Sequence, residues 1–298
     1  MLLDSASLYF RAFFGVPESI TAPDGTPINA VRGFLDMVAT LVARFSPSRL
    51  VACLDEDWRP AWRVELVPSY KAHRLVEGSI VEEVIPDTLT PQVPVILDVL
   101  AAFGIASVGA PGYEADDVIG SLVEREKGPV DVVTGDRDLF QLVDDARGAR
   151  VLYTGRGVAK LEIMDAAAVR KRYGIRPEQY ADFAVLRGDP SDGLPGVAGI
   201  GEKTAAGLLG THGSLAAALA VLDRGGVGLA PAVSRRLADA REYLRVAPKV
   251  VAVARDIDLP ELADALPASP RDPDALDALG ERWGIASSIA RLRDALPG

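Results

Sequence analysis

The chain has 298 residues, 49% of them hydrophobic, a formal charge of −10 and one cysteine. This composition excludes a disordered chain and a disulfide-based scaffold, and the length allows two domains. No apolar run is long enough to span a membrane, and residues 1–3 meet Asp4 at once, so we expect a cytoplasmic protein without a signal peptide. The negative charge does not exclude a nucleic-acid partner, because acids gathered around bound cations reverse the local field.

Two short apolar runs near the start, residues 1–4 and 49–55, each end in an acid, Asp4 and Asp55. The patterns at 8–14 and 29–44 predict helices. A strand, a helix and a strand with short connections favour parallel strands and a right-handed crossover. We therefore expect Asp4 and Asp55 to lie near each other at one edge of a sheet. The alternative for Asp4 is an N-cap of the first helix.

Residues 58–74 interleave basic and aromatic side chains. They include Arg59, Arg63, Lys71 and Arg74 together with Trp58, Trp62, Tyr70 and an isolated His73, which is not expected to bind metal. Such interleaving suits a phosphate backbone and stacked bases, and the alternative is a solvated helix whose tryptophans pack inward. Prolines at 60, 68 and 86 argue against a long straight helix. We expect a mobile excursion from the sheet that runs to about residue 92.

Three acids open the helix that follows a predicted helix at 91–103 and a strand at 105–108. Glu114, Asp116 and Asp117 fall within four residues, and the next apolar positions, beginning with Ile119, indicate a helix packed on the core. The acids repel one another, and the helix dipole offsets only about 0.3–1 kcal/mol for each. A hard divalent cation, Mg²⁺ or Mn²⁺, is the simplest compensation.

The stretch 129–139, PVDVVTGDRDL, predicts a buried strand, a turn at Thr134 and Gly135, and then two acids, Asp136 and Asp138. Open α/β sheets bind their ligands at the carboxyl ends of the strands. The alternative for Asp136 is a helix N-cap before the apolar residues 139–143. Because an acid follows one predicted strand after another, we favour a shared site.

The remaining chain predicts a strand at 151–153 and helices at 160–172, 214–222 and 231–245. Residues 249–258 form either a late strand or a loop, and 272–296 form two helices that pack on the body. Asp189 and Asp192 lie in a Gly/Pro/Ser turn, which repeats the paired-acid theme. The basic residues Arg235, Arg236, Arg241, Arg245 and Lys249 either extend a DNA-binding face or are ordinary solvated charges.

The glycine-rich run at about 193–209 predicts a helix-hairpin-helix. Its tight turn brings backbone amides against phosphates at the start of a helix, through Gly196, Gly199, Gly201, Lys203 and Thr204. The run does not predict a nucleotide-binding P-loop, because a Pro-rich turn rather than a strand precedes it.

In this order, Asp4, Asp55, YEADD, TGDRD, GDPSD and GVAGIGEKTA resemble the motifs of the 5′-nuclease superfamily, which includes the 5′-nuclease domain of bacterial DNA polymerase I and the flap endonucleases. The resemblance spans residues 2–244. It implies an α/β fold with a central, mostly parallel sheet flanked by helices (PIN-like), a helical arch and a helix-hairpin-helix (helix-three-turn-helix) region. The implied nuclease domain covers residues 1–176, with the arch at about 58–92, and a helical DNA-binding region covers 177–298.

The resemblance also implies roles for the residues. Asp4, Glu114, Asp116 and Asp136 would hold one Mg²⁺ or Mn²⁺ ion, and Asp138, Asp189 and Asp192 a second, mostly through water. Asp55 and Asp117 would lie further out, and the division between the ions is open. Lys71 and Arg74 match phosphate-polarising positions, and Tyr70 is similar to a residue that stacks on the terminal base. Arg59 and Arg63 would contact DNA, and carbonyls of the hairpin resemble a K⁺ site.

The implied activity is that of a stand-alone, monomeric, nucleoid-associated 5′-3′ exonuclease and 5′-flap endonuclease that hydrolyses DNA in replication (RNA primer removal) and repair. Its substrate would be DNA with a 5′ flap or a 5′ end. The alternatives are a catalytically weak, structure-selective DNA-binding protein and an RNA-directed nuclease. One departure is Gly193, where family members usually carry Asn, and we expect it to loosen that loop.

Overall fold

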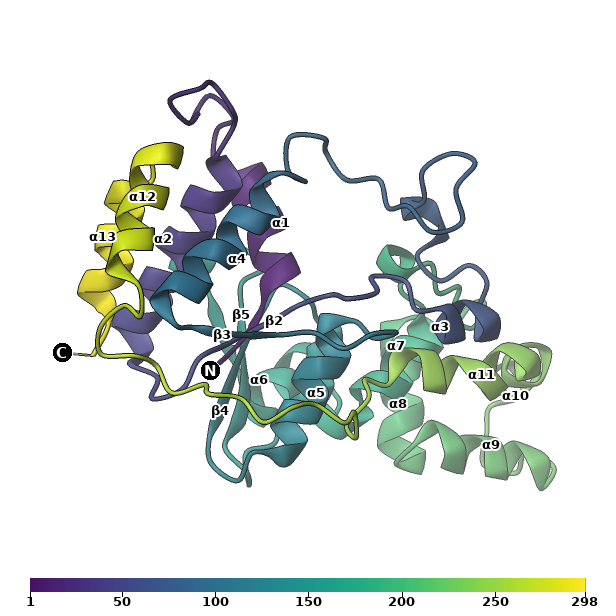
Figure 1. The fold of residues 1–298 in the computed structure, drawn as a ribbon. Coiled ribbons are helices and arrows are strands. Elements are labelled where there is room, and N and C mark those ends of the chain that lie inside the picture. Colours follow the sequence, from purple (N-terminus) through teal and green to yellow (C-terminus); the bar gives the residue numbers. More distant parts are fainter. Residues whose placement is uncertain (298) are drawn as a thin grey trace.

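A six-stranded sheet in the order β3-β2-β1-β4-β5-β6 forms the centre of the computed structural model, which describes residues 1–297 (Figure 1). Neighbouring strands run parallel except β6, which pairs antiparallel with β5 at the edge. The strands are β1 (Leu2–Asp4), β2 (Val51–Cys53), β3 (Ala106–Val108), β4 (Val130–Thr134), β5 (Ala149–Tyr153) and β6 (Glu162–Met164). The predicted α/β class with a mostly parallel sheet is confirmed.

Helices cover both faces of the sheet, and further helices form a lobe on one side of it (Figure 1). They are α1 (Ser5–Gly15), α2 (Asn29–Phe45), α3 (Ala61–Leu66), α4 (Gln92–Phe103), α5 (Ala115–Arg125), α6 (Ala166–Tyr173), α7 (Tyr180–Arg187), α8 (Glu202–His212), α9 (Leu215–Asp223), α10 (Pro231–Asp239), α11 (Arg241–Val251), α12 (Pro273–Trp283) and α13 (Ala286–Ala295). Short 3₁₀ turns occupy Ala72–Arg74, Asp138–Leu142, Val158–Lys160, Pro177–Gln179 and Pro190–Asp192. We call α7 to α11 the helical lobe.

Alternate residues of the central strands feed two separate cores. Leu3, Ala52 and Val133 face the layer of α1, α2, α4, α12 and α13, whereas Leu2 and Val132 face α5 and the helical lobe. This alternation follows from the two-residue period of a strand, and both faces are covered, as in parallel sheets generally. The last two helices return to the sheet, since α12 packs on α4 and α13 on α2.

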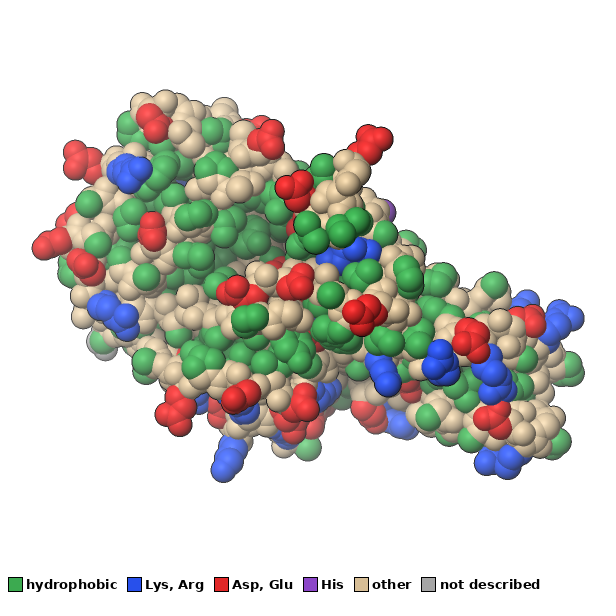
Figure 2. Space-filling view, turned by 45° about the vertical axis from the view of Figure 1, so that its right-hand side comes forward, with side chains coloured by type: hydrophobic (Ala, Val, Ile, Leu, Met, Phe, Trp, Pro, Cys, Tyr) green, Lys and Arg blue, Asp and Glu red, His purple; other side chains and the backbone are tan. Residues whose placement is uncertain are grey.

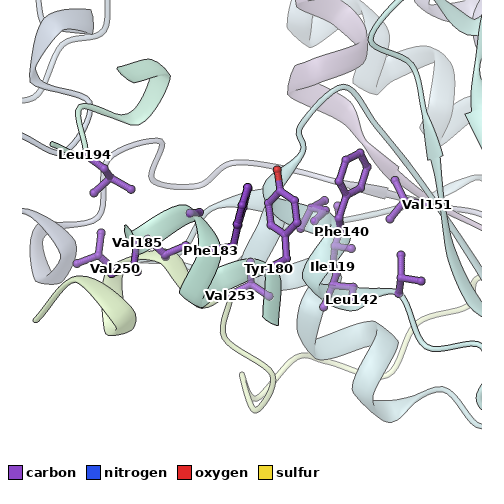
Figure 3. Close-up of a cluster of buried hydrophobic side chains, with 14 of the residues drawn as sticks. Ile119, Phe140, Leu142, Val151, Tyr180, Phe183, Val185, Leu194, Val250 and Val253 are labelled. Carbon is purple, nitrogen blue, oxygen red and sulfur yellow. The ribbon is translucent and has the colours of Figure 1, made fainter. Parts of the chain in front are cut away.

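The core continues from the sheet into the helical lobe without a break (Figure 3). Phe140 lies after β4, and its ring centroid is 5.4 Å from that of Tyr180 at the start of α7. Tyr180 in turn lies 6.0 Å from Phe183. Aromatic pairs at these separations bury large areas in fixed geometry. The lobe is therefore held in a fixed position beside the carboxyl edge of β4.

The helix predicted over 160–172 is wrong in its first part, because Glu162–Met164 forms the edge strand β6. A three-residue strand is too short to show a two-residue period, and its partner β5 is what fixes it. The helix begins only at Ala166, where Asp165 accepts a hydrogen bond from the amide of Ala168. The helix predicted over 231–245 is interrupted at Ala240, and α11 runs on to Val251 before irregular chain follows.

The segment between α3 and α4 leaves the sheet as a long excursion (Figure 1). Among the described residues from 58 to 91, no helix is longer than the six-residue α3, as the prolines predicted. Within residues 1–297 no single helix is long and apolar enough to cross a membrane. By length and composition α8 and α9 reach that measure only as a pair, and they are bent by 77°.

Candidate active site

Three strand-end acids meet at the carboxyl edge of adjacent strands. Asp4 ends β1, Asp55 follows β2 and Asp136 follows β4, and these strands are neighbours in the sheet. Asp4 also caps α1: its carboxylate accepts hydrogen bonds from the Ser7 amide (3.0 Å) and the Thr134 hydroxyl (2.6 Å). Cap and site are thus not exclusive alternatives, because the same carboxylate can do both.

The start of α5 adds two more acids to the same edge. The Asp55 carboxylate accepts a hydrogen bond from the Ala115 amide at 2.7 Å, which ties β2 to this helix. Glu114 and Asp116 lie on either side of Ala115 and line the same cavity of about 720 Å³ as the strand-end acids. The structure therefore brings together Asp4, Asp55, Glu114, Asp116 and Asp136 from segments far apart in the sequence.

Burial and mutual repulsion raise the pKa of four carboxylates in the cavity wall, those of Asp4, Glu114, Asp116 and Asp136. Burial, with smaller contributions from Asp55 and Asp136, raises the pKa of Asp4 to about 7, against the hydrogen bonds it accepts. Burial likewise raises the pKa of Glu114 to about 7, although Lys71 and Arg63 oppose the change. The pKa of Asp116 lies well above its ordinary value because of burial and the neighbouring Asp136 and Asp4. A cluster with such an excess of negative charge calls for cations.

A second set of acids lies beside the cavity rather than in its wall. These are Asp138, Asp189 and Asp192. One carboxylate oxygen of Asp138 is buried without a hydrogen-bond partner in the described structure, and its neighbours Asp136, Asp192 and Asp189 help burial to raise its pKa. Asp189 is bound by Arg187 at 3.0 Å, and Asp192 lies 3.4 Å from Arg74.

The donor set fits hard divalent cations. It consists of carboxylate oxygens, and one of them is buried with no protein partner. Among residues 1–297, however, no three acidic, histidine or cysteine side chains converge closely enough to enclose an ion by themselves. Ions that keep several of their waters, as Mg²⁺ does, need no such closed cage.

Lys71 and Arg74 reach the acids from the base of the excursion. The Lys71 ammonium lies 3.0 Å from a Glu114 oxygen, and Arg74 lies between Asp192 at 3.4 Å and Glu83 at 3.9 Å. Both basic side chains line the cavity. Cationic side chains and an acidic floor therefore face the same space, the arrangement required to hold a phosphate over metal ions.

The structure corrects the roles predicted for Arg63, as a DNA contact, and for Asp117, as an outer metal ligand, because their side chains are buried against each other. The Arg63 side chain is 2% exposed and Asp117 is fully buried, and they form a bidentate pair at 2.6 and 2.7 Å. The amide of Ala254 donates to the same Asp117 carboxylate at 2.8 Å. Asp117 thus joins α5 to α3 and to the chain after α11, and we remove Arg63 from the DNA contacts and Asp117 from the ligands.

Tyr70 and Arg59 also differ from the prediction. Tyr70 is 3% exposed, and its hydroxyl donates to the Glu114 carboxylate at 3.0 Å, so its ring has no free face for a base in this structure. Arg59 donates to the carbonyls of Tyr70 (2.6 Å), Pro68 (3.0 Å) and Ile80 (3.4 Å). Both side chains stabilise the excursion. Their partners lie 11 and 44 residues away in the sequence, so a local sequence pattern could not predict these hydrogen bonds.

The predicted hairpin lies at the entrance to α8. Gly196 and Gly199 have φ of +67° and +79°, and Gly201 is the N-cap, so the first turn of α8, with Lys203 and Thr204, follows the glycine turns directly. Lys203 is exposed. The Gly199 carbonyl accepts a hydrogen bond from Arg236 at 2.9 Å, so a K⁺ ion at this oxygen would first have to displace that guanidinium. Figure 2 shows Lys and Arg side chains gathered over the helical lobe.

One wall of the cavity was not foreseen. It is formed by Phe10, Arg11 and Phe14 of α1, with Arg156 after β5. Phe14 is 73% exposed, which is unusual for a large apolar side chain. The available signal was helical spacing, because positions 10 and 14 are four residues apart and so lie on one side of the first helix.

Comparison with known families defines first the class and then the family. A family model described as "5'-3' exonuclease, N-terminal resolvase-like domain" matches residues 1–174, and one described as "5'-3' exonuclease, C-terminal SAM fold" matches residues 175–274. The protein thus belongs to the class in which a resolvase-like sheet domain is followed by a helical SAM fold. The chain belongs to the 5′-3′ exonuclease family.

Individual relatives agree with this placement. A 5′-3′ exonuclease of Streptomyces coelicolor is 62% identical over 98% of this chain and 98% of its own length, and one of Mycobacterium tuberculosis is 52% identical over 100% and 98%. A DNA polymerase I of Mycobacterium bovis is 40% identical over 99% of this chain, which spans 32% of that protein.

Solved structures share the fold at low identity. The T5 D15 protein, co-crystallized with metal ions, matches with a TM-score of 0.65 and 17% identity over 99% of this chain and 96% of its own. Flap endonuclease-1 from Methanococcus jannaschii matches with a TM-score of 0.60 and 16% identity over 99% and 91%. At such identities these likenesses show the fold alone.

Proposed function

We propose that the protein is a divalent-metal-dependent 5′-3′ exonuclease and 5′-flap endonuclease that hydrolyses phosphodiester bonds of DNA. The observation that carries the proposal is the cavity whose wall holds six carboxylates, the five predicted ones and that of Glu83, together with Lys71 and Arg74. The relatives at 62% and 52% identity, both named 5′-3′ exonucleases, support the reaction class. The metal-bound T5 protein supports metal dependence, and we extend it to Mg²⁺ or Mn²⁺ here.

The residues divide the work by charge. Asp4, Glu114, Asp116 and Asp136, with Asp55 beside them, would hold one ion, and Asp138, Asp189 and Asp192 would hold a second, mostly through water. When bound, the ions would neutralise phosphate charge and lower the pKa of a water that attacks phosphorus. Lys71 and Arg74 would hold the non-bridging oxygens of the scissile phosphate. No Ser or His of the cavity wall forms a nucleophile pair, so water is the proposed nucleophile.

Release of the basic side chains from their acid partners is part of the proposed binding step. In the DNA-free structure Lys71 is paired with Glu114 and Arg74 with Asp192. With Glu114 and Asp192 holding ions, Lys71 and Arg74 would be free to bind the phosphate oxygens. The residues would thus exchange partners without a large movement of the backbone.

The helical lobe would hold the duplex. Gly196, Gly199 and Gly201 turn the backbone so that the first amides of α8 are free for phosphate, and the exposed Lys203 stands beside them. Such contacts read no sequence, which suits an enzyme that selects a 5′ end or flap. We propose RNA primer removal and DNA repair as its setting, a monomer on the nucleoid in the cytoplasm as its state, and the division of domains near residue 176.

The deciding experiment is cleavage of a 5′-labelled flap duplex by the wild type and two variants. Asp136→Asn changes the cavity, and Asp131→Asn, within the strand β4 that Asp136 follows but paired with Arg150 at 2.6 Å, is the matched control. We expect at least ~100-fold loss for Asp136→Asn, because each ligand supports several kilocalories of charge stabilisation, and little change for Asp131→Asn.

Parallel arms with EDTA, an RNA flap and an RNA–DNA hybrid separate the other candidates. Binding without Mg²⁺-dependent cleavage would identify a DNA-binding protein. Faster cleavage of RNA flaps than of DNA flaps would identify an RNA-directed nuclease. Equal cleavage rates for wild type and Asp136→Asn would reject the metal assignment.

A further inference from the structure

The base of the excursion lies directly on the loop that carries Asp189 and Asp192. The amide of Lys71 donates to the Asp192 carbonyl at 2.9 Å, and Arg74 donates to the Ser191 carbonyl at 2.8 Å. These bonds join two segments about 120 residues apart in the chain, one carrying the predicted phosphate-binding cations and the other two of the acids. The contact therefore sets where the cations stand relative to the acids.

Gly193 is the point of closest approach. A Cβ added there would lie 2.1 Å from the Ser69 carbonyl oxygen, 3.1 Å from its carbon and 3.3 Å from the Lys71 nitrogen. All three are backbone atoms, so no flexible side chain can yield, and the two segments would have to separate. The expectation that Gly193 loosens the loop is thus wrong: the missing side chain allows a tighter contact.

Lys71 has an uncommon backbone conformation at this contact. Its φ is +49°, and only Ser46 shares a positive φ among the non-glycine residues described. The left-handed region is unfavourable for a residue that carries a Cβ. The bond from the Lys71 amide to Asp192 compensates for that cost, and the resulting turn aims the side chain at Glu114, 3.0 Å away. Strain of this kind persists only where the surroundings hold it.

From this juxtaposition we infer that Gly193 is a positioning residue for Lys71. Its lack of a Cβ lets Ser69 and Lys71 dock on the acid loop, and docking holds Lys71 in the conformation that places its ammonium over the cavity. Because the loop continues directly into the glycine hairpin, the same contact fixes the distance between the duplex-binding hairpin and the cation at the scissile phosphate. The inference rests on the proposed function for its catalytic consequence and not for the docking itself.

Amide hydrogen exchange in the DNA-free protein tests the docking without reference to activity. In the wild type, the Lys71 amide should exchange slowly although it lies in an excursion from the sheet, because it is bonded to Asp192. In Gly193→Ala, peptides covering residues 68–75 should exchange faster while those of β1 and β4 keep their rates. The matched control is Gly174→Ala, since Gly174 has a φ of +72° and its added Cβ would meet only Ala206, at 3.7 Å.

Single-turnover cleavage tests the consequence. At saturating flap DNA, Gly193→Ala should cleave at least ~10-fold more slowly, since an ångström of misplacement suffices for such a loss, with duplex affinity nearly unchanged. Gly174→Ala carries the same unfavourable positive φ without the close approach, so a loss confined to Gly193→Ala assigns the effect to the Cβ and not to φ. In a Lys71→Ala background, Gly193→Ala should add little further loss, because its effect acts through Lys71.

The outcomes separate the two proposals. If the wild type cleaves flap DNA and Gly193→Ala matches it, the positioning role is overturned. Fast exchange of the Lys71 amide in the wild type would overturn it as well, even if a variant failed to fold. A wild type that cleaves no DNA while its Lys71 amide is protected would reject the proposed function and leave the docking established.

Discussion

Charged side chains are partnered differently at the two ends of the parallel strands, which we call the amino edge, where the strands begin, and the carboxyl edge, where they end. At the amino edge, Arg49 binds Asp264 at 2.7 Å and also pairs with Glu126, and Arg150 binds Asp131 at 2.6 Å. Backbone amides, chiefly that of Gly128, and Arg49 lower the pKa of Glu126. At the carboxyl edge the pKa values of Asp4, Glu114, Asp116 and Asp136 are all raised.

This difference separates structural from functional acids in one molecule. The acids of the amino edge have their partners within the chain, so they contribute to the fold and need nothing else. The acids of the carboxyl edge lack sufficient partners, so the fold holds them at a cost that a bound ligand can remove. Asp117 is the instructive exception, an acid of the carboxyl edge that Arg63 fully compensates.

Breaking the compensated pair should have the largest effect on stability. Arg63→Ala leaves the buried Asp117 without its partner, and we expect a loss of about 3–5 kcal/mol in the free energy of unfolding. Arg49→Ala, in the exposed pair of the amino edge, should cost no more than about 1 kcal/mol. Urea denaturation followed by circular dichroism measures both. Equal losses would contradict the distinction drawn between the two pairs.

Removing an uncompensated acid should have the opposite balance of effects. We expect Asp116→Asn to lose at least ~100-fold in flap cleavage, because a proposed ligand is removed. Its melting temperature should stay equal or rise, because repulsion by Asp136 and Asp4 is relieved. Differential scanning calorimetry and a cleavage assay on one preparation compare the two. A variant that is both active and less stable would reverse the assignment of Asp116.

The pH dependence of stability without metal should show the same imbalance. The pKa values of Asp4 and Glu114 are raised to about 7, so the folded state binds more protons than the unfolded chain at lower pH and loses stability as these groups ionise. The melting temperature in EDTA should therefore fall between about pH 4, near the ordinary pKa of these groups, and about pH 7. Saturating Mg²⁺ should raise it more at the higher pH. A metal-free melting temperature that rises over this interval would oppose the account.

The smallest expected effect concerns the helical lobe. Lys203→Ala should weaken binding to duplex DNA modestly and lower the slope of log affinity against log salt by about one, because one phosphate contact is lost. Fluorescence anisotropy in Ca²⁺ over a salt series measures the slope. An unchanged slope would place the duplex elsewhere on the molecule.

The parts of the site that depend on local sequence patterns could be predicted. Asp4, Asp55 and Asp136 each follow a recognisable strand, and parallel strands end at one edge, so their convergence could be predicted. The short strand β6 could not, because its pairing with β5 and not its own pattern defines it.

The orientation and burial of individual side chains near the site depend on partners far away in the sequence, which a local pattern does not show. Arg63 and Tyr70 are residue types that often contact DNA. In this structure Arg63 is instead buried in a pair with Asp117 and Tyr70 in a hydrogen bond to Glu114, each partner more than 40 residues away. Gly193 was recognised as a departure, but only the position of Ser69 gives its consequence.

Mn²⁺ binding measured by electron paramagnetic resonance tests the central claim most directly. The account predicts that the wild type and Asp131→Asn bind Mn²⁺ alike, whereas Asp116→Asn and Asp136→Asn each lose affinity by at least ~10-fold, since carboxylates supply the ligands of such ions. Equal Mn²⁺ affinity in all four proteins would contradict it.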